Sequence, residues 1–160
     1  MTAPEKKTFT LERIFKASPD KVWAMWTTRE GLERWWGPDG FRVVVQHLDV
    51  RVGGRFEILM TAVRAEIVAH LKTLGLPAST LARGHYTDVE THRRLAYANA
   101  MDFVPGVAPY TTATVVQLSS TASGGTRLVV TNDALHDATW TENARRGWEQ
   151  QLRNLEKCFD

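Results

Sequence analysis

The feature that most constrains the fold is the amphipathic segment at the end of the chain, TWTENARRGWEQQLRNLEKCFD (139–160). Its apolar side chains recur every three or four residues, which predicts a helix with one apolar face, and Thr139 or Thr141 can cap its start. The stripe consists of Ala144, Trp148, Leu152, Leu155 and Phe159. Because such a face has to be buried, the rest of the chain must supply a surface that receives it.

Gly147 lies beside Trp148 in this predicted helix. Glycine in a helix interior costs about 1 kcal/mol relative to alanine, so another feature must compensate for it. We expect the helix to approach a second surface closely at Gly147.

Much of the preceding sequence favours antiparallel strands. Apolar and polar residues alternate in KTFTLERIFKAS (7–18), and Gly53-Gly54 joins two strand-like runs as in a hairpin. Later β-rich runs are separated by Val104-Pro105-Gly106 and by Ser123-Gly124-Gly125, which predicts a meander. The runs after the first strand are FRVVVQHLDV, GGRFEILMTA, RGHYTDVE, RRLAYANAMDF, YTTATVVQLSS and TRLVVTND.

Three shorter helices interrupt this pattern. Ser18 can cap a helix that has Pro19 in its first turn, and a second short helix begins near Arg29. A third helix is predicted at about 64–75, because apolar residues again step by three or four before Gly75 ends the run. Its stripe consists of Val63, Ile67, Leu71 and Leu74.

These elements predict an α+β fold in which a strongly curved antiparallel sheet wraps around the C-terminal helix. That arrangement buries the apolar face of the helix and that of the sheet together. A chain of 160 residues is long enough for one core of this kind, so we expect a single domain over 1–160.

Composition excludes several classes of function. The net charge is +2 and the basic residues are scattered, which argues against nucleic acid as a partner. No apolar run reaches the roughly 20 residues of a membrane span, and the start, MTAPEKKTFTLER, lacks a signal-peptide core, so we expect a cytoplasmic protein. Cys158 is the single cysteine, and the five histidines lack ligand spacing, so neither a metal nor another cofactor is expected.

Several spaced motifs resemble the activator of heat-shock-protein-90 ATPase homologue-like family, within the START-like, helix-grip superfamily. They occur in the family's order over roughly residues 8–159: LERIFKASPDKVWAMWTTREGLERWWGP, LDVRVGGRFEILM, RGHYTDVETHRRLAY, GGTRLVV and RRGWEQQLRNLEK. The resemblance implies a helix-grip fold with an internal cavity beside the last helix. The segment VRAEIVAHLKTLGLPASTLA departs from it, because the family usually has a short polar hairpin turn there.

The resemblance implies no single activity. Eukaryotic members stimulate the ATPase of a chaperone, whereas relatives in the wider superfamily bind lipids or act as polyketide cyclases, and a fold alone does not settle function. We expect most strongly a small apolar or amphipathic ligand in the cavity. The expected ligand-binding residues are Trp36, Phe56, Met60, Tyr86, Asp88, Tyr97, Asn99, Met101 and Trp148.

Two adjacent tryptophans, Trp35 and Trp36, lie in the second of the short predicted helices. Neighbouring helix positions lie about 100° apart, so the two indoles cannot face inward equally. We expect Trp35 to belong to the core, and Trp36 to be either core or cavity wall.

Two other functions stay open. The chain can act as a co-chaperone-like interaction protein, or as a cyclase or hydrolase in which Asp88 or His85 is the acid or base and Tyr97 or Asn99 orients the substrate. No catalytic residue is assigned. The inserted helix can cover the cavity mouth, pair with a second subunit in a homodimer, or pack on its own domain edge.

Overall fold

The computed structural model describes residues 7–159, so residues 1–6 and 160 of the expected single domain lie outside the described part. Seven strands form one antiparallel sheet in the order β1-β7-β6-β5-β4-β3-β2. The strands are β1 (Thr8–Phe15), β2 (Phe41–Leu48), β3 (Arg55–Ala62), β4 (Ser79–Glu90), β5 (Arg94–Met101), β6 (Tyr110–Ser120) and β7 (Thr126–Asp133). The helices are α1 (Pro19–Thr27), α2 (Arg29–Trp35), α3 (Ala65–Thr73) and α4 (Ala138–Lys157).

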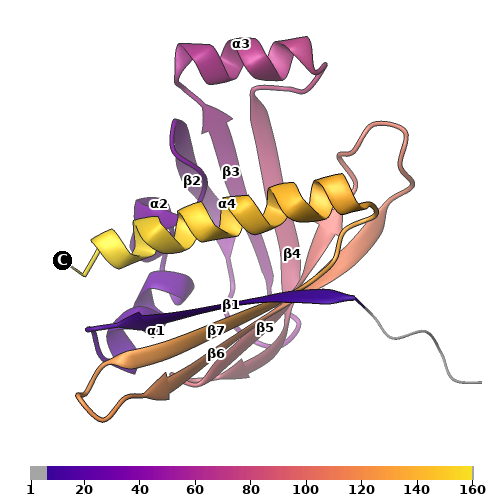
Figure 1. Cartoon of the computed structure of the whole chain (residues 1–160). Coiled ribbons are helices and arrows are strands. Elements are labelled where there is room, and N and C mark those ends of the chain that lie inside the picture. The colour runs from indigo at the N-terminus through magenta and orange to yellow at the C-terminus, as the bar shows by residue number, and fades with distance from the viewer. Residues whose placement is uncertain (1–6, 160) are drawn as a thin grey trace, which may run out of the picture.

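The sheet curves around α4, which crosses its concave face (Figure 1). The strand and helix order, the meander and the α+β helix-grip architecture are therefore as the sequence predicts. Alternation in β1 also holds, since Phe9, Leu11 and Phe15 are buried while Ile14 is exposed.

The N-cap of the long helix α4 lies two residues before Thr139 and four before Thr141, the two expected caps. Asp137 is its N-cap, and its carboxylate accepts a hydrogen bond from the backbone N–H of Trp140 at 2.8 Å. Thr141 instead donates its hydroxyl to the backbone oxygen of Asp137. Aspartate is a stronger N-cap than threonine, and Asp137 follows the end of β7 by four residues. The C-terminal half of the helix contributes Leu152 and Leu155 to the core, both fully buried.

The helices α1 and α2 close one end of the sheet. Ser18 occupies the N-cap position of α1 as expected, although its side chain makes no cap hydrogen bond and donates to Asp20 instead. Thr28 caps α2 by accepting from the N–H of Gly31 at 3.0 Å. The carboxylate of Glu33 accepts from the backbone N–H of Val45, which ties α2 to the edge strand β2.

The helix α3 lies between β3 and β4, at the end of the sheet away from α1 (Figure 1). It confirms the inserted helix predicted at about 64–75. All its residues are exposed or only partly covered, and the flanking Val63 and Leu74 are 59% and 57% exposed. An amphipathic helix with so little cover gains little from packing on its own domain.

Candidate ligand-binding cavity

A cavity of about 560 Å³ lies between the concave face of the sheet and the N-terminal half of α4. Its floor comes from β1 and from β3 to β7, its roof from α4, and its mouth from α3 and the segment that follows β5. Volumes of about 300–1,000 Å³ are typical of sites for small molecules. Of the nine residues expected to bind a ligand, five line this cavity, namely Trp36, Met60, Asn99, Met101 and Trp148.

One face of α4 forms the roof. Its lining positions follow the helical repeat of three and four residues, as one face of a helix requires. They are Trp140, Asn143, Ala144, Gly147, Trp148 and Gln151. The apolar stripe therefore divides along its length, with the first half over the cavity and the second half in the core.

The expectation of a close approach at Gly147 is wrong. Among the described residues, no heavy atom would come within 4 Å of a Cβ added there, beyond the glycine's own neighbours in the helix. Gly147 is part of the roof, and it borders the open cavity instead of touching the sheet. A larger side chain at this position would occupy the open volume.

A tryptophan cluster, made by Trp26, Trp35, Trp36 and Trp148, closes one end of the cavity. Trp148 stacks on Trp26 with ring centroids 5.8 Å apart, and it meets Trp36 edge to face at the same distance. Trp35 is 1% exposed and donates its indole N–H to the backbone oxygen of Met25 at 2.7 Å, so it is a core residue. Trp36 is only partly buried and lies on the cavity wall.

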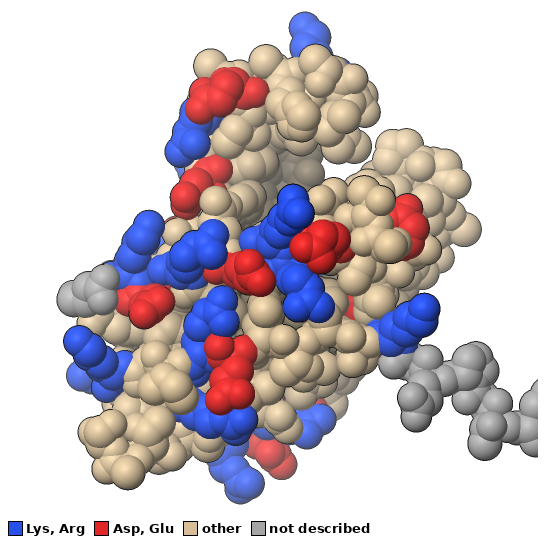
Figure 2. Space-filling view, in the orientation of Figure 1, with Lys and Arg blue, Asp and Glu red and all other residues tan. Residues whose placement is uncertain are grey.

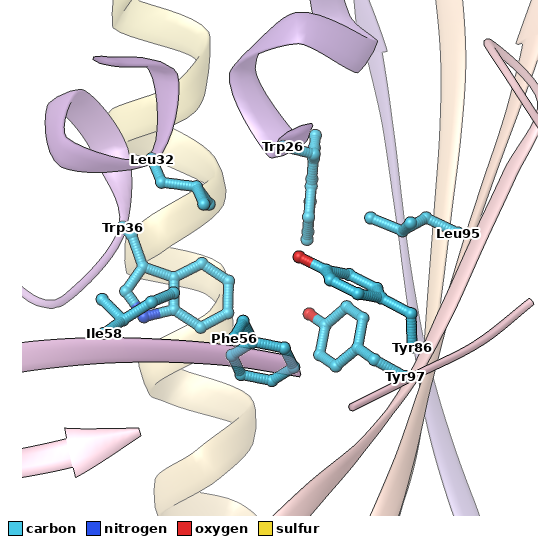
Figure 3. Close-up of a pocket in the computed structure, with 8 residues that line it drawn as sticks. All are labelled: Trp26, Leu32, Trp36, Phe56, Ile58, Tyr86, Leu95 and Tyr97. Carbon is cyan, nitrogen blue, oxygen red and sulfur yellow. The ribbon is translucent and has the colours of Figure 1, made fainter. Parts of the chain in front are cut away.

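The residues Phe56, Tyr86 and Tyr97 were expected to line the same cavity, but they lie behind the tryptophan cluster. Their rings pack edge to face or tilted at 5.3–6.1 Å, and the void they share with Trp26 and Trp36 is only about 10 Å³. Figure 3 shows the two tyrosine hydroxyls pointing into this aromatic core, toward Trp26. Such a void holds about one water molecule, so this region is filled core.

Burial dominates the chemistry of that core. Burial raises the pKa of Tyr97 well above its usual range, although the nearby Thr114 side chain opposes the shift. Burial also raises the pKa of Tyr86, and the negative charge of Asp49 raises it further. The Tyr97 hydroxyl is buried, and no described residue gives it a hydrogen bond of normal geometry. Both phenols therefore stay neutral at ordinary pH.

Close packing in the aromatic core explains Gly84. A Cβ there would lie 2.8 Å from the ring of Phe56 and 2.0 Å from the backbone oxygen of Ala98. Only glycine lets the Phe56 ring cover β4 at this point.

The structure places Asp88 and His85 away from the cavity. A β-bulge lies between Tyr86 and Asp88, which pair with Tyr97 and Ala96 on β5, so the alternation of side chains shifts by one residue. Asp88 consequently forms an ion pair with Arg94 at 2.8 Å and is partly exposed, and His85 is exposed. Neither residue lies where it could act on a molecule in the cavity.

A polar strip crosses the cavity floor in the middle of the sheet. It consists of Asn99 on β5, Thr112 and Thr114 on β6, and Asn132 on β7. The Asn99 amide nitrogen donates to Thr114 Oγ1 at 2.9 Å, and that hydroxyl donates to Asn132 Oδ1 at 2.7 Å. The strip is a connected hydrogen-bond chain within an otherwise apolar wall.

Only Asn99 of this strip was expected in the site. The alternation of buried residues could have found Thr114 and Asn132. On β6, Val116 and Leu118 mark the buried face, and on β7, Leu128 and Val130 do so. Each polar residue lies two positions further along its strand, and therefore on the same face. Polar residues at positions where the alternation expects apolar ones were the sequence sign of this strip.

Few charges reach the cavity wall. The guanidinium of Arg83 forms an ion pair with Asp102, and the carboxylate of Asp133 accepts from the backbone N–H of Ala113 at 2.7 Å. On the outer side of α4, Lys and Arg alternate with Asp and Glu in one mixed surface (Figure 2). Within residues 7–159, no group of three or more possible metal ligands comes together, and no helix is long and apolar enough to cross a membrane.

The curved sheet, the gripped helix and the cavity between them define a helix-grip protein of the START-like class. The chain belongs to the family described as activator of Hsp90 ATPase homolog 1-like protein, whose model matches residues 16–160. This confirms the family that the motifs indicate.

Solved structures of similar proteins share the whole fold. A protein from Chromobacterium violaceum is 24% identical, with a TM-score of 0.77 over 95% of this chain and 96% of its own. An AHSA1-like protein from Aeromonas hydrophila is also 24% identical, with a TM-score of 0.73 over 94% and 90%. An AHSA1 protein from Silicibacter pomeroyi is 20% identical, with a TM-score of 0.73 over 94% and 96%. No curated protein matches the sequence significantly.

Proposed function

We propose that the protein binds a small apolar or amphipathic molecule in the cavity between its sheet and α4. The observation that carries this proposal is the cavity of about 560 Å³ under a glycine in the middle of a long helix. A core that served stability alone would be filled, since interiors pack to crystal-like density. Aromatic and methionine side chains on the wall, among them Trp140 and Met60, suit an apolar guest.

Native mass spectrometry of freshly purified protein tests this proposal first. We expect a fraction of the protein to carry one bound molecule, which is released and identified after denaturation. The same spectrum counts subunits, and so tests whether the poorly covered α3 pairs two copies. A titration with the environment-sensitive dye N-phenylnaphthylamine complements it, because dye bound in an apolar cavity brightens. Absence of both a retained molecule and dye binding would contradict the proposal.

The family description favours a second candidate function, in which the protein stimulates the ATPase of an Hsp90-type chaperone through its surface. The exposed apolar residues flanking α3, Val63 and Leu74, provide a surface for such a partner. The test is the ATPase rate of purified chaperone with and without the protein, with a Leu74→Ser variant as control. An unchanged rate at saturating protein would remove this candidate and leave ligand binding untouched.

A further inference from the structure

The side-chain amide of Asn99, on the cavity floor, has one polar atom that the protein leaves free. Asn99 lies on β5, the middle strand of the seven, where it lines the cavity and is partly exposed. Every hydrogen bond of its side chain is donated by Nδ2. Its Oδ1 has no partner among the described residues, and it is not one of the side-chain atoms that are both buried and unpartnered. Oδ1 is therefore accessible from the open space that Asn99 lines.

Contacts with β6 fix the orientation of this amide. Asn99 Nδ2 lies 3.2 Å from the backbone oxygen of Thr112, which can only accept, so this atom must be the nitrogen. The same NH₂ group donates to Thr114 Oγ1 at 2.9 Å, so both of its N–H bonds are used within the sheet. Exchanging nitrogen and oxygen would set Oδ1 against the Thr112 carbonyl oxygen. Asn99 therefore presents an acceptor, and no donor, to the cavity.

The β4 side of Asn99 brings no donor to Oδ1 among the described residues. Asn99 pairs with Gly84, which has no side chain, and the apolar ring of Phe56 covers that glycine. Tyr97 precedes Asn99 by two residues and shares its face of the sheet, but its hydroxyl points into the aromatic core, toward Trp26 (Figure 3). A donor for Oδ1 has to come from a molecule in the cavity.

We propose that Asn99 is a specificity-determining residue, whose Oδ1 selects apolar ligands that carry a hydrogen-bond donor, a hydroxyl or N–H group. The inference rests on the proposed function and adds the chemical class of the ligand. An ether, ketone or carboxylate offers only lone pairs to Oδ1 and gains no hydrogen bond there. The apolar remainder of the ligand lies against Trp148 and Met60 on the cavity wall.

The test is competition against N-phenylnaphthylamine by decanol and methyl nonyl ether, two isomers of which only the alcohol can donate a hydrogen bond. The measured quantity is the ratio of the ether concentration to the alcohol concentration that displaces half of the dye. This ratio should be about fivefold higher for wild-type protein than for Asn99→Leu, the effect of one net hydrogen bond. Leucine is similar in size and removes the acceptor. Comparing ratios cancels the difference in hydration between the two isomers.

A measurement on wild-type protein decides the question if Asn99→Leu fails to fold, as judged by circular dichroism. The NMR signal of the Asn99 side-chain carbonyl carbon should shift on saturation with decanol, because Oδ1 then accepts a hydrogen bond, and should shift much less with the ether. The backbone signals of Ala144 and Met101, which line the same cavity, should shift with both isomers. Equal shifts of the Asn99 carbon with both isomers would contradict the proposal.

Thr131→Val is the matched control, because it removes a polar group whose hydroxyl contacts Thr10 on the outer face of the sheet. Its ratio should equal that of wild type. Dye displacement with the same ratio in wild type and Asn99→Leu would overturn the role of Asn99 and leave the cavity function standing. No dye binding at all would overturn both.

Discussion

Gly147 offers a substitution that separates cavity binding from stability. It lies in the interior of a helix of 20 residues, and beyond its own neighbours in the helix an added Cβ would meet no described atom within 4 Å. Gly147→Ala should therefore recover most of the helix propensity that glycine lacks, about 0.5–1 kcal/mol. For a chain of this size, that gain raises the melting temperature by about 1–4 °C.

Gly147→Leu should add nearly the same stability, since leucine ranks just below alanine in helix propensity, and should also fill part of the cavity. Binding of N-phenylnaphthylamine should weaken at least about tenfold, equivalent to roughly 1.4 kcal/mol. The alanine variant should bind much as wild type does, and thus separates helix propensity from occlusion. Urea denaturation gives the unfolding free energies, and dye titration gives the affinities.

The reasoning would be refuted if Gly147→Leu lowered the free energy of unfolding. Overpacking at a site where the helix touches the sheet costs typically 1–3 kcal/mol, so a loss of that size would mean that the cavity is closed at Gly147. Unchanged dye affinity in a stabilised leucine variant would instead mean that ligands bind elsewhere.

Three further predictions follow from the core and the mouth. Trp35→Ala should cost about 3–5 kcal/mol in urea denaturation, whereas Trp36→Ala should cost much less and weaken dye binding. Burial raises the folded-state pKa of Tyr86 and Tyr97. Their contribution to stability is therefore complete below the unfolded pKa of about 10 and is lost as the pH rises above it. The free energy of unfolding should consequently be lower at about pH 11 than at about pH 9. Leu71→Asp, at the partly exposed mouth, should weaken dye binding with little change in melting temperature.

The fold was predictable because its signals are local and agree with one another. The helical stripe from Ala144 to Leu155, the alternation in β1 and the turn at Gly53-Gly54 each specify one element, and a curved sheet is the arrangement that buries them all. The cap of α4 was misplaced by a few residues because Asp137 and Thr139 are both of residue types that cap helices, and the apolar stripe does not mark which of them begins the helix.

The site was less predictable, because facing directions depend on irregularities that a sequence does not mark. The bulge between Tyr86 and Asp88 reverses the alternation and moves Asp88 out. The aromatic rings of Phe56 and Tyr97 pack edge to face against each other in the core. Aromatic character alone therefore does not distinguish a core residue from one on the cavity wall. The sequence predicted a close contact at Gly147, because nothing in the sequence indicates that the space beside this glycine is open.

The most direct test of the account is an amide NMR titration of the wild-type protein with N-phenylnaphthylamine. We predict that the backbone signals of Gly147, Ala144, Ala100 and Met101, which line the cavity from both sides, shift together and saturate with one affinity. Signals of the outer face of the sheet, such as Thr10, should stay unchanged. Shifts confined to the outer face or to α3, with those of α4 unaffected, would contradict the claim that the gripped helix covers a binding cavity.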